Sequence, residues 1–127
     1  MKILHIDCSP RDESHSRKLS AAIVARLLDR SPDASVTRRD LGRDPLPHAQ
    51  VDYAQALSSP GTLAGAHAET TMHLSEQLIG EVEAADVLVI GTPMHNFTVP
   101  SVLKAWRDQI LRMGRTIGTA PTGEKVG

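Results

Sequence analysis

Hydrophobic residues form short runs that alternate with amphipathic stretches along the chain. Segment 86–91 carries an apolar run rich in β-branched residues, which predicts a strand buried in a sheet, and segment 2–7 is predicted to be a similar strand. Segment 34–39 has a thinner pattern and is expected to be a strand at a sheet edge. Amphipathic helices are predicted from apolar residues at helical spacing in three segments, 16–30, 66–84 and 100–113. This alternation predicts an α/β fold with a parallel sheet and right-handed crossovers.

The first predicted helix carries an apolar stripe, which should face the core. The residues of this stripe are Leu19, Ala22, Ile23 and Leu27.

The ends of the helices carry local signals. Ser14 or Ser16 can cap the first helix, Pro100 suits the first turn of the last helix, and Gly114 suits its C-terminal cap. Leu74, Leu78 and Val82 form the stripe of the middle helix. Segment 40–65 reads as a long excursion and segment 116–127 as a loop.

Length and charge exclude several classes of protein. The chain has 127 residues, which suits one domain over 1–127, and its net charge is −1 with scattered basic residues. We therefore expect no nucleic-acid or membrane partner. Met1 and Lys2 lead directly into a strand, so no signal peptide is expected, and the single cysteine, Cys8, cannot form an internal disulfide. A cytoplasmic location is the expectation.

The loop after the first strand has the composition of an anion site. A helix start offers unpaired backbone amides, and the hydroxyls of Ser9, Ser14 and Ser16 add donors, so the loop can hold a phosphate without lysine. The alternative is that these serines are ordinary helix caps.

Charged residues in the same loop both favour and oppose the binding of an anion. Arg11 or Arg17 would favour an anion, whereas Asp12 and Glu13 would oppose one unless they point away. The glycine-rich dinucleotide fingerprint and the Gly-Lys-Ser/Thr phosphate loop are both absent from the sequence. This argues against a Rossmann-type nicotinamide site and against nucleotide hydrolysis.

A second polar loop follows the 86–91 strand, at the sheet edge where open α/β sheets bind ligands. Met94 and Phe97 can cover a flat heteroaromatic ring, while Asn96 and the backbone can bind its rim. Two alternatives stay open: the loop caps the last helix, or Phe97 and Trp106 are core anchors.

Four motifs together resemble the flavodoxin-like FMN-dependent NAD(P)H:quinone oxidoreductases, specifically the FMN-dependent NADH-azoreductases. The motifs are Ser9-Pro10 with Ser14-His15-Ser16, Gly91-Thr92-Pro93-Met94-His95-Asn96-Phe97, Pro100-Ser101-Val102-Leu103-Lys104-Ala105-Trp106, and Gly114-Arg115-Thr116. The resemblance implies a doubly wound three-layer α/β/α fold that binds FMN. It assigns the FMN phosphate to Ser9, Ser14, His15 and Ser16, and the flavin ring and ribityl chain to Pro93, Met94, His95, Asn96 and Phe97.

The sequence departs from that family in two respects. His95 stands where the family usually has tyrosine. Family members are single domains of about 200 residues, so the strand with the third flavin loop is expected after Gly127. The strand at 87–90 would then be an apolar edge. Three outcomes are open: the chain is a fragment, it pairs this edge with another chain, or segment 116–127 covers it. The first is the one we expect.

The resemblance also implies the chemistry. NAD(P)H would reduce FMN, and a quinone or azo compound would then take the electrons in a ping-pong cycle, in a homodimer. His95 is the candidate to donate a proton to the acceptor; the alternative is a solvent-facing loop histidine. The competing functions are a flavodoxin-like binding module without catalysis and a general FMN reductase.

Two other sets of residues carry weaker signals of chemistry. Cys8 is either a thiolate near the helix start or a small core residue. The spacing of His67, Glu69 and His73 does not place two ligands on one helix face, so no metal site is expected.

Overall fold

The computed structural model describes residues 1–47, 66–119, 121, 123, 125 and 126. Three parallel strands form one sheet in the order β2–β1–β3, from β1 (Lys2–Asp7), β2 (Ser35–Asp40) and β3 (Val87–Gly91). Lys2 of β1 pairs with Ser35 of β2, and Ile3 pairs with Val87 of β3. The parallel sheet and the edge position of the thin second strand are confirmed.

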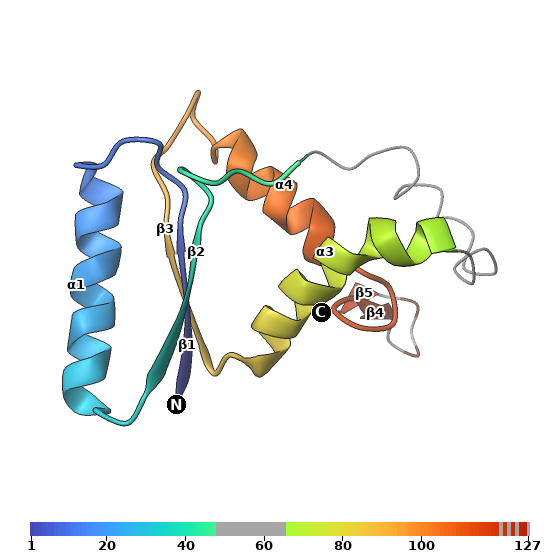
Figure 1. Ribbon diagram of the computed structural model, residues 1–127, viewed down its shortest axis with the longest axis horizontal. Coiled ribbons are helices and arrows are strands. Elements are labelled where there is room, and N and C mark those ends of the chain that lie inside the picture. The colour runs from blue at the N-terminus through green and yellow to red at the C-terminus, as the bar shows by residue number, and fades with distance from the viewer. Residues whose placement is uncertain (48–65, 120, 122, 124, 127) are drawn as a thin grey trace.

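Helices cover both faces of this sheet. Helix α1 (His15–Arg30) lies on one face, and α3 (Ala66–Ala84) and α4 (Ser101–Ile110) lie on the other, as Figure 1 shows. The predicted three-layer α/β/α arrangement is therefore confirmed. None of the helices in the described residues is long and apolar enough to cross a membrane.

The sheet separates two hydrophobic clusters because strand side chains alternate between faces. Toward α3 and α4 the buried residues are Leu4, Ile6, Cys8, Leu41, Leu78 and Trp106. Toward α1 they are Ile3, Val24 and Val89. Leu74 and Val82 pack against the first cluster, which confirms the predicted stripe of α3, and Trp106 is a core anchor.

The predicted stripe of α1 is only partly right. Leu19 and Ile23 are 64% and 44% exposed, whereas Arg17 and Ser20 are buried. Hydrogen bonds of the polar side chains explain this orientation. Ser20 donates to the buried Asp7 carboxylate, and the Arg17 guanidinium binds Asp40. These bonds rotate Leu19 and Ile23 away from the sheet and toward the outer edge of β3.

The last helix ends earlier than the pattern predicts. Leu111, with ψ 104°, is its C-terminal cap, and its amide donates to the Arg107 carbonyl. The chain then turns, because the Arg112 amide donates to Thr116 Oγ1 at 2.8 Å. Gly114 does adopt a positive φ of 86°, but it belongs to this turn and not to the helix cap.

The expected loop at 116–127 contains a short antiparallel pair instead, β4 (Gly118–Thr119) with β5 (Lys125–Val126). These strands pair with each other and not with β3. Leu88 and Ile90 of β3 are accordingly 44% and 41% exposed. The strand is not buried on both faces; in the part of the chain that the structure describes it is the apolar edge that was also expected at 87–90.

Two predictions fall partly outside the described residues. The long excursion is described only to residue 47, where the backbone after β2 turns with the Asp44 amide donating to the Asp40 carbonyl. The side chains of His67 and Glu69 also lie outside the description.

Candidate functional site

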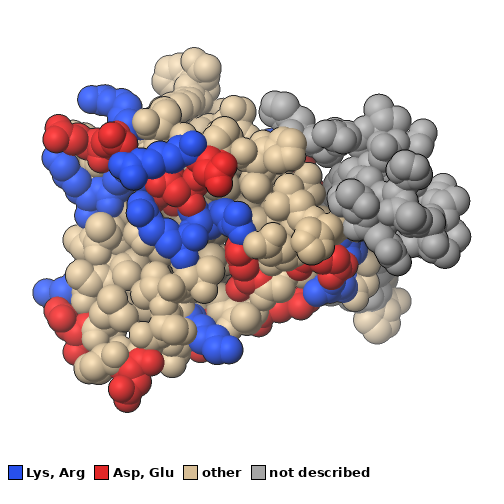
Figure 2. All heavy atoms as spheres, viewed as in Figure 1, with Lys and Arg blue, Asp and Glu red and all other residues tan. Residues whose placement is uncertain are grey.

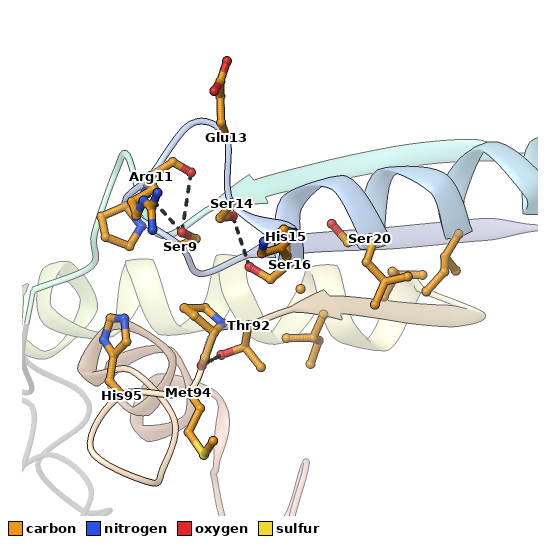
Figure 3. Close-up of a pocket in the computed structure, with 17 residues that line it drawn as sticks. Ser9, Arg11, Glu13, Ser14, His15, Ser16, Ser20, Thr92, Met94 and His95 are labelled. Carbon is orange, nitrogen blue, oxygen red and sulfur yellow. Dashed lines mark hydrogen bonds between the residues drawn. The ribbon is translucent and has the colours of Figure 1, made fainter.

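A cleft of about 670 Å³ opens at the carboxyl ends of β1 and β3, between these strands and the start of α1 (Figure 3). The loop after β1 forms one wall and the loop after β3 forms the other. Seven residues predicted from the sequence line it together: Ser9, Ser14, His15, Ser16, Pro93, Met94 and His95. The structure thus brings the two predicted loops to one site.

Hydrogen bonds organise the serine side of the cleft. Ser14 is the N-terminal cap of α1, and its hydroxyl accepts from the Arg17 amide at 3.2 Å. The hydroxyls of Ser14 and Ser16 lie 3.2 Å apart, and Ser9 Oγ accepts from the Arg11 amide at 3.1 Å. The first amides of α1 have no acceptor within the helix and point toward the same end. Ser14 therefore caps α1 and lines the cleft at the same time.

The charges of this loop are arranged in favour of an anion. Asp12 is paired with Arg43, whose Nη2 lies 2.6 Å from Asp12 Oδ1. Figure 3 shows the Glu13 side chain extending away from the labelled serines. Arg11 lines the cleft, whereas Arg17 lies behind the loop and binds the Ser9 carbonyl and Asp40. Of the two arginines considered from the sequence, Arg11 is the one that faces the cleft.

The loop after β3 ends in a tight hairpin turn. The His95 amide donates to the Thr98 carbonyl at 2.8 Å, and the Thr98 amide donates back at 2.9 Å. The two residues between them, Asn96 and Phe97, have φ of 50° and 65°, the left-handed conformation of a type I′ turn. Such a φ is uncommon for a bulky residue, and strain of this kind concentrates at functional sites.

The tip of this turn does not line the cleft. Met94 lines it while remaining 72% exposed, whereas Asn96 and Phe97 stand outside its lining. Phe97 is 96% exposed, so the alternative that it anchors the core is wrong. Its ring is available to cover a ligand or another surface.

Sequence reasoning missed the apolar wall of the cleft. Leu19 and Ile23 of α1 and Val89 and Ile90 of β3 line it, although the pattern assigned all four to the core. Only the rotation of α1 and the edge position of β3 turn them into site residues. The remaining lining residues that were not predicted as site residues are Pro10, Arg11, Glu13, Ser20, Gly91 and Thr92.

Gly91 sets how closely α1 approaches β3. A Cβ at this position would lie 2.8 Å from the Ser16 carbonyl oxygen and from Ser20 Oγ, and 2.9 Å from Asp7 Oδ1. Such contacts are too short for any side chain, so glycine is required for this close approach. The first turn of α1 is thereby held against the end of β3, which fixes the width of the cleft.

Burial raises the pKa of the Cys8 thiol to about 11, and the nearby Asp7 carboxylate adds to the effect. The residue is fully buried in the core on the α3 and α4 side. A thiol with this pKa stays protonated at neutral pH, which supports the core interpretation of Cys8 and not the thiolate one.

Comparison with known proteins agrees with this architecture. A family model described as "Flavodoxin-like fold" matches residues 1–127. Among curated proteins, the FMN-dependent NADH:quinone oxidoreductase 2 of Cupriavidus pinatubonensis is 47% identical over 99% of this chain and 61% of its own length. The FMN-dependent NADH:quinone oxidoreductase 4 of Pseudomonas fluorescens is 45% identical over 98% of this chain and 59% of its own length.

Solved structures show the same likeness. The crystal structure of azoreductase from Bacillus anthracis strain Sterne superposes with a TM-score of 0.86 at 27% identity, covering 100% of this chain and 62% of that one. The chain thus spans about 60% of the length of the relatives that it matches. Among known proteins, it is similar to FMN-dependent NADH:quinone oxidoreductases and to azoreductases. Because the family model matches over the whole chain, the protein belongs to the flavodoxin-like fold family.

Proposed function

We propose that the protein binds FMN in the cleft and passes electrons from NAD(P)H to quinones or azo compounds. The observation that carries this proposal is the meeting of the serine loop and the Pro93–His95 loop around one cleft at the carboxyl ends of parallel strands. The relatives named as FMN-dependent NADH:quinone oxidoreductases and the azoreductase structure support the same function.

The residues of the cleft fit both ends of a flavin mononucleotide. One end offers hydroxyls at Ser9, Ser14 and Ser16 beside the start of a helix, a set of donors suited to a phosphate. The other end offers apolar surface from Pro93 and Met94, suited to a flat ring. The cleft volume of about 670 Å³ lies within the roughly 300–1,000 Å³ of small-molecule sites.

The serine side would bind and orient the phosphate. The amides of His15 and Ser16 lie at the positive end of the α1 dipole, and Arg11 adds a cation at the mouth of the cleft. Pairing with Arg43 partly neutralises Asp12, one of the two acidic side chains of this loop. A phosphate is therefore favoured here by several donors.

The β3 side would hold the ring. Met94 would supply apolar contact, and Asn96 and Phe97, which follow in the hairpin turn outside the cleft lining, would contact the ring from beyond it. FMN held by these residues would supply the hydride chemistry between NAD(P)H and the acceptor, in the ping-pong cycle that we propose. His95 lines the cleft, which supports it as the residue whose imidazole would donate a proton or hydrogen bond to the acceptor.

The assembly would be a homodimer located in the cytoplasm. Leu19 and Ile23 of α1 and Ile90 of β3 line the cleft with exposed apolar side chains, and Leu88 of β3 is exposed as well. An apolar patch next to a ligand cleft is suited to an interface. The same exposure favours the second candidate function, a flavodoxin-like binding module without catalysis, because the cleft is bordered there by an unpaired strand edge in the described part of the chain.

Titration of FMN with the purified chain, followed by quenching of flavin fluorescence, tests the proposal. Ser14→Asp keeps a residue that caps helices but places a negative charge beside the phosphate, so FMN binding should fall by about tenfold or more. Ser101→Asp is the matched control, since it adds the same charge at the start of α4, away from the cleft. A folded wild-type chain that does not bind FMN would contradict the proposal.

Catalysis is tested separately on the FMN-bound chain by following NAD(P)H oxidation with a quinone. His95→Gln should slow the quinone half-reaction by about 10²-fold while flavin affinity changes little. FMN binding without NAD(P)H oxidation would favour the binding module instead.

A further inference from the structure

Arg17 lies directly behind the serine loop. Its side chain is 7% exposed and does not line the cleft. Its Nε and Nη2 donate to the carbonyl oxygen of Ser9 at 3.1 and 2.6 Å. A buried guanidinium therefore holds the backbone of the residue whose hydroxyl faces the cleft.

Asp40 fixes the orientation of this guanidinium. Arg17 Nη1 and Nη2 donate to the two carboxylate oxygens at 2.8 and 2.7 Å, a bidentate pair. Asp40 ends β2 and also accepts from the Arg43 amide at 3.0 Å. These hydrogen bonds form a brace that runs from the end of β2 through Asp40 and Arg17 to the Ser9 carbonyl.

The brace also balances charge behind the loop. Two carboxylates, Asp7 and Asp40, lie beside the two guanidinium groups of Arg17 and Arg38. Figure 2 shows acidic and basic side chains interleaved on the face that it presents. Removing the Arg17 charge would leave one uncompensated negative charge behind a loop that faces an anion.

We propose that Arg17, held by Asp40, is a positioning residue for the phosphate of the cofactor. It fixes the Ser9 carbonyl, which keeps the Ser9 hydroxyl and the Arg11 amide in their places at the cleft, and it offsets the charges of the Asp7 and Asp40 carboxylates behind them. It acts on the phosphate end of the site and not on the ring. The inference rests on the proposed FMN function and names the residue that shapes its phosphate subsite.

The test compares the affinities of the chain for FMN and for riboflavin, which lacks the phosphate. In Arg17→Met the affinity for FMN should fall about tenfold, while the affinity for riboflavin stays within about twofold. Arg17→Lys keeps the charge but loses the fork of donors, so it should show a smaller loss in the same direction. Arg26→Met, an exposed position on the same helix, is the matched control and should leave both affinities unchanged.

A second readout needs no cofactor. Hydrogen exchange of the Arg11 amide, which donates to Ser9 Oγ, should become at least about tenfold faster in Arg17→Met than in Arg26→Met. If Arg17→Met does not fold, Arg17→Lys is measured in the same two ways.

The outcomes separate the two proposals. Equal losses for FMN and riboflavin, with unchanged exchange at Arg11, would show that Arg17 serves stability alone and would overturn the inference while leaving the proposed function intact. A folded wild-type chain that binds neither flavin would overturn the proposed function and the inference together. A selective loss for FMN with faster exchange at Arg11 supports both.

Discussion

Replacing Gly42 by alanine should disrupt the loop behind the cleft. A Cβ on Gly42 would lie 1.9 Å from the Ser9 carbonyl oxygen and 2.9 Å from Arg17 Nη2. The nearer atom belongs to the backbone, so no side-chain rotation can relieve the clash. Either the Ser9 carbonyl or the turn at Gly42 must move by about 1 Å to restore a normal contact.

The cost follows from what that carbonyl binds. Overpacking of this kind costs about 1–3 kcal/mol. The displaced carbonyl also accepts two bonds from Arg17, at 2.6 and 3.1 Å, and losing one charge-assisted bond adds about 1.5–3 kcal/mol. Gly42→Ala should therefore lower the free energy of unfolding by about 2.5–6 kcal/mol.

Urea denaturation followed by circular dichroism measures this change. Gly80→Ala is the matched control, because a Cβ on this residue of α3 would meet no atom within 4 Å. Alanine is the better helix former, so Gly80→Ala should raise the free energy of unfolding by about 0.5–1 kcal/mol. A Gly42→Ala chain within about 0.5 kcal/mol of wild type would refute the packing argument.

Three further predictions concern charge, thiol chemistry and association. The bond from Arg17 lowers the pKa of Asp40 from 3.8 to about 2. The stabilisation of the fold by this pair is therefore present above pH 3.8 and is lost as the pH falls toward 2. Urea midpoints should fall less over this range in Asp40→Asn than in wild type. The Cys8 thiol, with its pKa raised to about 11, should resist alkylation at about pH 8 and react once urea unfolds the chain; rapid labelling of the native chain would contradict its burial. The exposed edge of β3 should promote self-association that Ile90→Lys reduces in sedimentation velocity, and a wild-type chain that stays monomeric at every concentration would count against this.

Strands and helices with strong local patterns were predictable to within a residue or two. The strand at Lys2–Asp7 and the helix at Ala66–Ala84 match their predicted bounds, because their periodicity is uninterrupted. The end of α4 was not predictable. The hydroxyl of Thr116, six residues beyond Ile110, donates to the Ile110 carbonyl, and the chain turns back after the helix. A side-chain bond of that kind is local but leaves no signal in the apolar periodicity.

The site was predictable where it depends on topology. The carboxyl ends of neighbouring parallel strands meet at one edge, so the serine loop and the Pro93–His95 loop had to meet once the sheet was parallel. The apolar wall was not predictable, because the same residues, Leu19 and Ile23, satisfy a core stripe equally well on paper. Pairing of Arg17 with Asp40, 23 residues away, also has no sequence signature.

These two misses have a common physical cause. A helix placed by hydrophobic burial alone would turn Leu19 and Ile23 toward the sheet and leave Arg17 in water. In α1 the reverse holds: Arg17 and Ser20 are buried with the carboxylates of Asp40 and Asp7. Burying charged groups is favourable only when each is fully paired, and this pairing also fixes the Ser9 carbonyl. The rotation of α1 therefore leaves Leu19 and Ile23 exposed, but it fixes the serine loop and gives the cleft an apolar wall. The proposed FMN site requires both.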